Sequence, residues 1–152
     1  MSKTGGRALS RQNLPFIERD EQAVAAIARG GYVLRDVENP QAIIIATGSE
    51  VEIALAAQKQ LADKGIAVRV VSMPCTNVFD EQPAEWRDQV LLPGVPRVAI
   101  EAGSTMGWYK YVGLDGAVIG LDTYGESAPA GQLFEHFGIT AAKLGEAVEN
   151  GL

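Results

Sequence analysis

Hydrophobic and polar positions follow two different periods along this chain, and they predict strands and helices in turn. Ala42–Ala46 is a continuous apolar run of strand length, which is typical of a strand buried on both faces of a sheet. Residues 49–64 then repeat apolar side chains every three or four positions and predict an amphipathic helix. Ile66–Ser72 predicts the next strand. A strand, a helix and a strand within about thirty residues indicate a right-handed parallel crossover.

Short sequence signals mark the two ends of this predicted helix. Ser49 and Glu52 have the spacing of a capping box, in which each side chain bonds to a free N–H of the first turn. Lys64 and Gly65 supply the charge and the glycine that a helix C-terminus favours. We therefore expect the Ser49 hydroxyl to serve as a helix cap.

The same alternation of strand and helix continues on both sides of this unit. Residues 18–29 favour a helix that ends at Gly30, and residues 32–37 alternate as an edge strand does. The later predicted elements are a helix at 82–90, a buried strand at 97–101, an edge strand at 118–121, and helices at 130–137 and 140–149. These elements predict a three-layer α/β/α sandwich with a mostly parallel sheet of five strands.

Composition describes a single soluble domain. The 152 residues are 47% apolar and 21% charged, which is ordinary for a globular protein. We expect one domain at 9–152, preceded at 1–8 by a flexible leader or by what a truncation left. The net charge of -6 and the lack of a basic run argue against a nucleic-acid surface and an anionic membrane surface. No apolar run reaches the roughly 20 residues of a membrane span. The single cysteine, Cys75, favours a reducing, cytoplasmic location.

Arg11 is the side chain with the clearest binding chemistry. It follows Ala8–Ser10, which has the pattern of a strand end, and Pro15 stops the run soon after it. An arginine at the carboxyl end of a strand can bind a phosphate or a carboxylate with two parallel hydrogen bonds. It can equally form an ion pair with a neighbouring domain. The residues alone leave both interpretations open.

Gly48 and Ser49 form a second, weaker candidate for anion binding. They lie where a strand leads into a helix N-terminus, a position that favours anions. Neither glycine-rich phosphate motif is present, and the carboxylates of Glu50 and Glu52 would repel a phosphate. A structural role is therefore favoured for this pair, and it stays only a minor candidate edge for an anion or other ligand.

Nucleophilic and metal chemistry lack their partner residues. Residues 125–129 lack the second glycine of a nucleophile elbow, and the sole histidine, His136, is expected on the exposed side of a helix. One histidine and one cysteine supply no zinc set, and the carboxylates are scattered. Cys75 follows a predicted strand, without a histidine or lysine nearby to lower its pKa. No catalytic residue and no metal ligand are predicted.

The aromatic group Trp108–Tyr111 allows three interpretations. Such side chains can line a ligand pocket, pack in a core, or anchor an interface between proteins. An interface is favoured, because tryptophan and tyrosine combine a large apolar area with one polar tip.

A series of short segments, in order along the chain, resembles the C-terminal domain of transketolase. The matching segments are Ser10–Pro15, Gly30–Leu34, Ile45–Val51, Val68–Pro74, Phe79–Asp80, Trp108–Tyr111, Tyr124–Pro129 and Phe134–Gly138. The resemblance covers almost everything from Leu9 to the C-terminus and implies one antiparallel strand in the sheet.

This resemblance implies a function that the chain would perform only within a larger enzyme. Transketolases are cytoplasmic homodimers of the pentose phosphate pathway that transfer a two-carbon ketol unit between sugar phosphates. They use thiamine diphosphate with Mg²⁺ or Ca²⁺. The chain lacks the family's Gly-Asp-Gly cofactor motif, so it is expected to bind no cofactor and to be inactive alone. The missing N-terminal and middle domains would be its partners, and Arg11 would contribute to binding the substrate phosphate.

Two alternatives remain open at this stage. A sister enzyme such as dihydroxyacetone synthase contains a similar domain. A freestanding regulatory or small-anion-binding module of the same fold would use the carboxyl edge of the sheet near Gly48 and Pro74.

Overall fold

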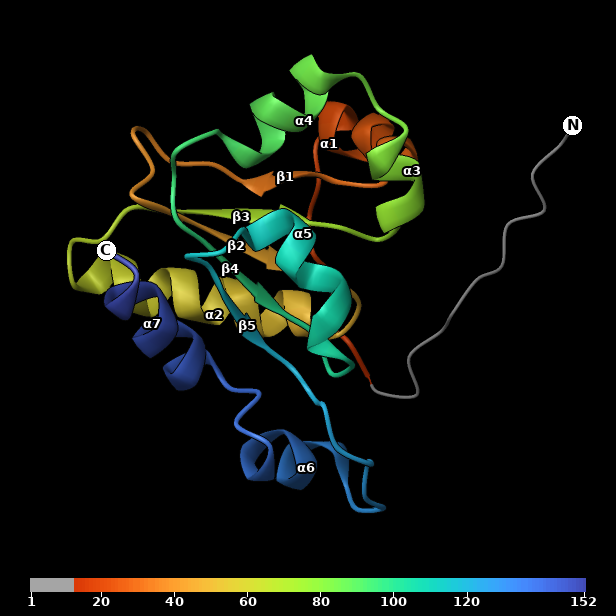
Figure 1. Ribbon diagram of the computed structural model, residues 1–152, viewed down its shortest axis with the longest axis vertical. Helices are drawn as coiled ribbons and strands as arrows, with labels where there is room; N and C mark the ends of the chain where they lie inside the picture. Colours follow the sequence, from red (N-terminus) through yellow and green to blue (C-terminus); the bar gives the residue numbers. More distant parts are fainter. Residues whose placement is uncertain (1–12) are drawn as a thin grey trace, which may run out of the picture.

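The computed structural model describes residues 13–152 and contains a five-stranded sheet between two layers of helices (Figure 1). The strands are β1 (Tyr32–Arg35), β2 (Ala42–Ala46), β3 (Val68–Ser72), β4 (Arg97–Ile100) and β5 (Ala117–Ile119). Their order in the sheet is β1-β3-β2-β4-β5. β1 runs antiparallel to β3, and the other neighbouring pairs are parallel. The predicted five-stranded, mostly parallel sheet with one antiparallel strand is confirmed.

Helices cover both faces of this sheet, as the three-layer prediction requires. They are α1 (Glu21–Ala26), η1 (Ile27–Arg29), α2 (Glu50–Asp63), α3 (Thr76–Asp80), α4 (Ala84–Leu91), η2 (Thr105–Trp108), α5 (Tyr109–Val112), α6 (Ala130–His136) and α7 (Ala141–Asn150). α2 and α7 pack on one face, and α3, α4 and α5 pack on the other. The short helices α3, η2 and α5 were not predicted, because four or five residues are too few to display a helical period.

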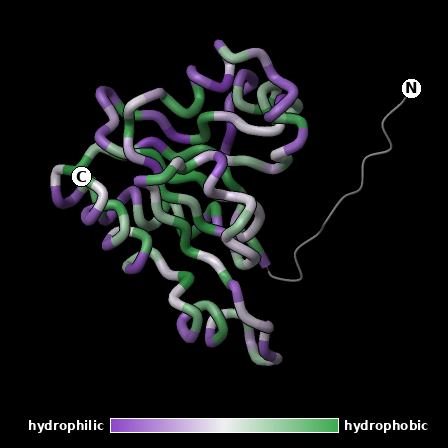
Figure 2. Tube along the Cα trace, in the orientation of Figure 1, coloured by the Kyte–Doolittle hydropathy of each residue, from purple (hydrophilic) through white to green (hydrophobic). Residues whose placement is uncertain are grey.

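The central strand β2 is buried on both faces because β3 and β4 flank it and helices cover it above and below. Ala42, Ile44 and Ala46 belong to the core under α2 and α7. Ile43 and Ile45 point the other way and belong to the core under α3, α4 and α5. This alternation follows the two-residue period of a strand and explains why the whole run is apolar. In Figure 2 the strands at the centre carry hydrophobic colours, whereas the outer helices are mixed.

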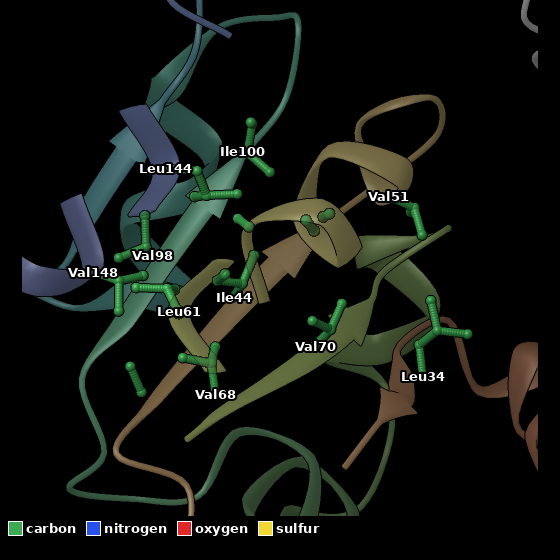
Figure 3. Packing of buried hydrophobic residues seen from close by; sticks show 14 of the residues in the cluster. Leu34, Ile44, Val51, Leu61, Val68, Val70, Val98, Ile100, Leu144 and Val148 are labelled. Atoms are coloured by element: carbon green, nitrogen blue, oxygen red, sulfur yellow. The ribbon is translucent and has the colours of Figure 1, made fainter. Parts of the chain in front are cut away.

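The first core joins the sheet to α2 and α7. Figure 3 shows Ile44 and Val98 of the sheet directed toward Leu61 of α2 and toward Leu144 and Val148 of α7. Each of these side chains is at least 97% buried. Full burial of one such side chain stabilises the fold by about 1.5–3 kcal/mol, so this layer contributes much of the stability.

Two polar side chains link helices and strands through hydrogen bonds to backbone carbonyl groups. Gln58 of α2 donates from Nε2 to the Val68 carbonyl at 2.7 Å. Arg97, at the start of β4, donates to the Leu91 carbonyl at 2.8 Å and to the Tyr111 carbonyl at 3.0 Å. One guanidinium thus satisfies carbonyl groups near the C-terminal ends of α4 and α5, which have no partner within their own helices.

The aromatic group at 108–111 is mostly core, which corrects the interface prediction. Trp108 and Tyr111 are only 4% and 6% exposed, and their ring centroids lie 5.9 Å apart. Their polar tips are satisfied inside the chain: the Trp108 indole N–H donates to Glu101, and the Tyr111 hydroxyl donates to Asp80 at 3.0 Å. With these tips bonded, the rings are stable in the core without a partner protein. Tyr109 alone of the three aromatic residues is exposed.

The capping box predicted at the start of α2 is also wrong. The backbone of Ser49 is already helical (φ -69°, ψ -25°), whereas a capping residue has an extended backbone. Its hydroxyl therefore makes no bond to the first turn and donates instead to Glu50 at 2.8 Å. Glu52, the other member of the expected box, is exposed. The predicted end of this helix at Lys64 and Gly65 is confirmed.

Gly30 lies at a close backbone approach between η1 and α3. Its φ is +81°, and its carbonyl accepts the Cys75 N–H at 3.0 Å. A Cβ at this position would lie 2.4 Å from the Cys75 carbonyl oxygen and 2.5 Å from the Phe79 nitrogen. Only glycine therefore fits at this position, because any other residue would have a strained positive φ and a Cβ that overlaps the backbone of α3 and its preceding residue.

We expect Gly30→Ala to destabilise the fold by at least about 3 kcal/mol, since a positive φ and a backbone clash add together. Gly65→Ala is the matched control, because Gly65 also has a positive φ (+78°) but no atom within 4 Å of the added Cβ. This control should cost only about 1 kcal/mol. Urea denaturation of both variants measures the difference, and equal losses would show that the close approach to Cys75 is unimportant.

Candidate functional site

The carboxyl ends of β2 and β4 meet where the chain changes direction across the sheet. From β2 the chain passes through α2 to β3 on one side. From β3 it returns through α3 and α4 to β4 on the other side of β2. The two connections cover opposite faces of the sheet. The loop after β2 and the loop after β4 therefore lead away from each other at this edge. In open α/β sheets such a switch point is the usual ligand-binding position.

Two hollows lie at this carboxyl edge. One, of about 370 Å³, is lined by residues that follow all three central strands, among them Thr47, Cys75, Thr76, Glu101 and Ser104. The other, of about 330 Å³, is lined by Gly48, Ser49 and Pro74 together with residues 14–17. The predicted candidates Gly48 and Ser49 therefore do lie at a hollow of this edge.

The segment next to Arg11 is part of this edge. Leu14, Pro15, Phe16 and Ile17 line the second hollow beside Gly48. Arg11 itself, the predicted strand at 8–10 and the predicted leader lie outside the described residues.

The carboxyl groups of Glu50 and Glu101 lie at this edge, and Arg19 also lines the second hollow. Glu50 is only 4% exposed, and its Oε1 accepts the Ser49 hydroxyl. Burial raises the pKa of Glu50; the Ser49 hydrogen bond opposes this rise, and the nearby Glu101 carboxylate adds to it. From the sequence, Glu50 was expected only as a charge that repels anions, and Glu101 was not predicted at this edge. Glu101 directly follows β4, and Glu50 comes four residues after the end of β2. Their positions just after central strands are the sequence signal that could have placed both residues at this edge.

This arrangement is not suited to a phosphate at Gly48 and Ser49. The Ser49 hydroxyl is already donating to a carboxylate, and Glu50, Glu52 and Glu101 supply negative charge nearby. The first hollow instead offers neutral hydrogen-bonding groups, including the Thr47, Thr76 and Ser104 side chains. Its chemistry favours a neutral hydroxyl-bearing group over an anion. The anion role of Gly48 and Ser49 stays a prediction.

The other chemistry-bearing residues lie apart from one another. Cys75 is exposed at the first hollow. His136 is exposed on α6 and packs edge-to-face on Phe137, with ring centroids 4.8 Å apart. Within residues 13–152, no group of three or more His, Cys, Asp or Glu side chains is arranged to hold a metal ion. In the same part of the chain, no helix is long and apolar enough to cross a lipid bilayer.

A third hollow, of about 770 Å³, adjoins the loop after β5, and no sequence pattern predicted it. We call it the Asp122 hollow. Its rim carries the exposed apolar side chains of Met106, Tyr109 and Tyr124. Asp122 fixes the loop, because its carboxylate accepts the Thr105 hydroxyl at 2.6 Å and the Thr105 N–H at 2.9 Å. These hydrogen bonds lower the pKa of Asp122.

Glu50 predicts a pH-dependent stability. Because burial raises its pKa in the folded chain, the folded state binds the proton more tightly than the unfolded state. The stability that the Glu50 carboxyl contributes to the folded state is present at low pH and is lost as pH rises through the raised pKa. Glu50→Gln removes that loss, so the variant should gain stability relative to wild type as pH rises above 4.5, the ordinary pKa of a glutamate side chain.

Urea denaturation at a series of pH values measures this gain. Glu52→Gln, an exposed carboxylate on the same turn of α2, is the matched control and should follow wild type. If the stability curves of wild type and Glu50→Gln stay parallel over this pH range, the Glu50 carboxyl does not titrate as its burial requires.

Comparison with known proteins places this geometry in a family. The family of the transketolase-like C-terminal domain matches residues 30–140. The plasmid transketolase of Cupriavidus necator is 57% identical over 139 residues, which are 91% of this chain and 21% of that protein.

Solved structures agree with this match. The transketolase of Pichia stipitis, in complex with sedoheptulose-7-phosphate, is 38% identical with a TM-score of 0.85, over 93% of this chain and 20% of that one. A split-gene transketolase, described as an inactive β4 tetramer, is 27% identical with a TM-score of 0.69, over 93% of this chain and 48% of that one.

The chain spans about a fifth of the length of the curated relatives that it matches. Its sheet order, its single antiparallel strand and its two helical layers are those of a domain that superposes on part of solved transketolases. The chain therefore belongs to the transketolase-like C-terminal domain family.

Proposed function

We propose that this chain acts as the C-terminal domain of a transketolase, an enzyme of the pentose phosphate pathway that transfers a two-carbon ketol unit between sugar phosphates. The observation that carries the proposal is the close likeness of nearly the whole chain to about a fifth of a named transketolase. The rest of such an enzyme, namely its N-terminal and middle domains, would be the partner of this domain. A sister enzyme such as dihydroxyacetone synthase has less support, because the relatives compared are named transketolases.

Within that enzyme, Arg11 would bind the phosphate of the sugar substrate. This proposal is supported by the residues that follow it, since Leu14 to Ile17 line a hollow at the carboxyl edge of the sheet. Ligands of open α/β sheets bind at this edge. A guanidinium just ahead of that segment would suit a phosphate, because its planar fork can make two parallel hydrogen bonds. The sedoheptulose-7-phosphate complex of the Pichia relative is consistent with this class of substrate.

The cofactor and its metal ion would be bound outside this chain, by the other domains. The residues at the carboxyl edge do not fit thiamine diphosphate, because Glu50 and Glu101 place negative charge where a diphosphate would need positive partners. The same carboxylates weaken the alternative of a small-anion-binding module at Gly48 and Pro74. The isolated chain is therefore proposed to be inactive. The split-gene relative, described as inactive, supports this expectation.

The second role of the domain would be packing against other domains or a second subunit. The Asp122 hollow supports this role, since Met106 is 81% and Tyr124 98% exposed at its rim. Large apolar side chains gathered on one surface typically mark an interface. Asp122 holds the two loops of this surface together through Thr105, so the surface is already formed in the isolated domain.

We expect the purified chain, supplied with thiamine diphosphate and Mg²⁺, to show no ketol transfer in an assay that follows sugar phosphate products.

In a complete transketolase that contains this domain, Arg11→Gln should raise KM for phosphorylated substrates by roughly tenfold to a hundredfold, since charge-assisted hydrogen bonds are lost. KM for unphosphorylated substrates should change far less.

Lys59→Gln is the matched control for charge, because Lys59 is exposed on α2 and away from the carboxyl edge hollows. Ketol transfer by the chain alone would overturn the proposed dependence on other domains. Equal changes in KM for phosphorylated and unphosphorylated substrates would remove the phosphate role of Arg11 and leave the family assignment intact.

A further inference from the structure

A hollow of about 710 Å³ lies along the outer edge of β1, between α1 and α4, and we call it the β1 hollow. In Figure 1, α1 and α4 lie next to β1 at the end of the sheet opposite to β5. Its volume is within the range of about 300–1,000 Å³ that small-molecule sites occupy. Among the predicted candidates that the structure describes, neither Gly48 nor Ser49 lines it.

The charge of the β1 hollow is opposite to that of the whole protein. Four arginines line it, against two carboxylates, in a chain whose net charge is -6. The lining charged residues are Arg19, Arg29, Arg35, Arg69, Asp20 and Asp36. Such a positive concavity on an acidic protein concentrates small anions from solution.

One of these arginines has a structural role. Arg69 is 8% exposed and binds both carboxylate oxygens of Asp36, at 2.8 and 2.9 Å. Its remaining terminal nitrogen donates to the carbonyl groups of Gln89 and Val90 at 2.8 and 3.3 Å. Asp36 is thereby neutralised. Asp20, the second carboxylate of the hollow, is used as the N-cap of α1 and accepts the Ala23 N–H at 2.7 Å.

Arg19 and Arg35 differ from Arg69 because neutral groups hold them. Arg19 donates to the Tyr32 hydroxyl at 2.8 Å and to the Ile17 carbonyl at 2.9 Å. Arg35 donates to the Leu34 carbonyl at 2.9 Å and to the Glu18 carbonyl at 3.3 Å. The two guanidinium groups are thus anchored on consecutive carbonyl groups of the chain, at positions 17 and 18.

This anchoring leaves donors of both groups available. A guanidinium has five N–H donors, and each of these two uses only two of its nitrogens on residues 13–152. No carboxylate within the described residues forms an ion pair with either group. Positive side chains that line one hollow without an ion-pair partner repel one another, and an anion bound among them reduces this cost.

We propose that the β1 hollow binds a small phosphate-bearing anion through Arg19 and Arg35. The planar forks of two arginines suit the several acceptor oxygens of a phosphate dianion. Arg29 also lines the hollow and contributes further positive charge, and its guanidinium stacks on Trp86 at 4.1 Å from the ring centroid. The Trp86 indole is fixed in turn by its bond to the Gly31 carbonyl at 3.1 Å. Arg19 also lines the hollow beside Gly48, so the two regions share this residue, but the proposed site does not use Arg11.

Calorimetric titration of the 152-residue chain with inorganic phosphate, glycerol 3-phosphate and glycerol, at low ionic strength, tests the proposal. Saturable binding of the two phosphates, and none of glycerol, is expected. Tighter binding of glycerol 3-phosphate than of phosphate would identify a phosphate monoester as the ligand, and the reverse order would identify free phosphate. No saturable binding of either phosphate would overturn the proposal.

Variants then locate the site. The double variant Arg19→Gln/Arg35→Gln should bind phosphate at least roughly tenfold more weakly, because charge-assisted hydrogen bonds are lost. Lys59→Gln/Lys143→Gln removes the same charge from outside the β1 hollow and should bind as wild type does. Equal weakening in this control would show non-specific attraction and overturn the proposal. So would loss of binding in Arg11→Gln together with retention in the double variant.

If the double variant fails to fold, NMR spectra of the wild-type chain and of a single variant still test the proposal. Trp86 lines the β1 hollow and Trp108 does not, so the two indole N–H signals in a ¹⁵N NMR spectrum report separately. Phosphate should shift the Trp86 signal of the wild-type chain and leave Trp108 in place. In the single variant Arg35→Gln, whose side chain is exposed, the same shift should need a higher phosphate concentration. An unmoved Trp86 signal would contradict the proposed site.

Discussion

The burial of β2 on both faces is the constraint on which the rest of this structure depends. Five consecutive apolar residues cannot be exposed to water on either side, so helices must cover the strand above and below. Strands must also flank it, because its backbone groups would otherwise lack hydrogen-bond partners. The two connections from β2 and β3 therefore pass over opposite faces, and the switch point at the carboxyl edge is a consequence of this arrangement.

Arginine side chains perform two different functions around this frame. Arg97 and Arg69 reach inward and bond carbonyl groups at helix ends, so their donors are nearly all used within the fold. Arg19 and Arg35 also bond carbonyl groups, but they are half-buried and exposed, respectively, and some of their donors have no partner among residues 13–152. The contrast separates arginines that replace missing backbone partners from arginines that remain able to bind another molecule.

Sequence patterns predicted the elements that a repeating hydrophobic period defines. They failed where a side chain has several possible hydrogen-bond partners. The β2 run and the α2 face have lengths of several periods, and both were confirmed. Ser49 had the right spacing for a cap, but its hydroxyl is closer to Glu50 in a backbone that is already helical. Trp108 and Tyr111 were misjudged because their acceptors, Glu101 and Asp80, are distant in the sequence or on another element. Spacing alone cannot reveal such partners.

The reversed direction of β1 has a consequence for how this domain is joined to whatever precedes it. Because β1 is antiparallel to β3, Tyr32 at its start pairs with Ser72 at the end of β3. The chain thus arrives at the same edge of the sheet where the parallel strands finish. A fully parallel sheet would receive the chain at the opposite edge, a full strand length away. One inverted strand is therefore enough to bring a preceding segment, and any domain attached to it, beside the loops that follow β2 and β4.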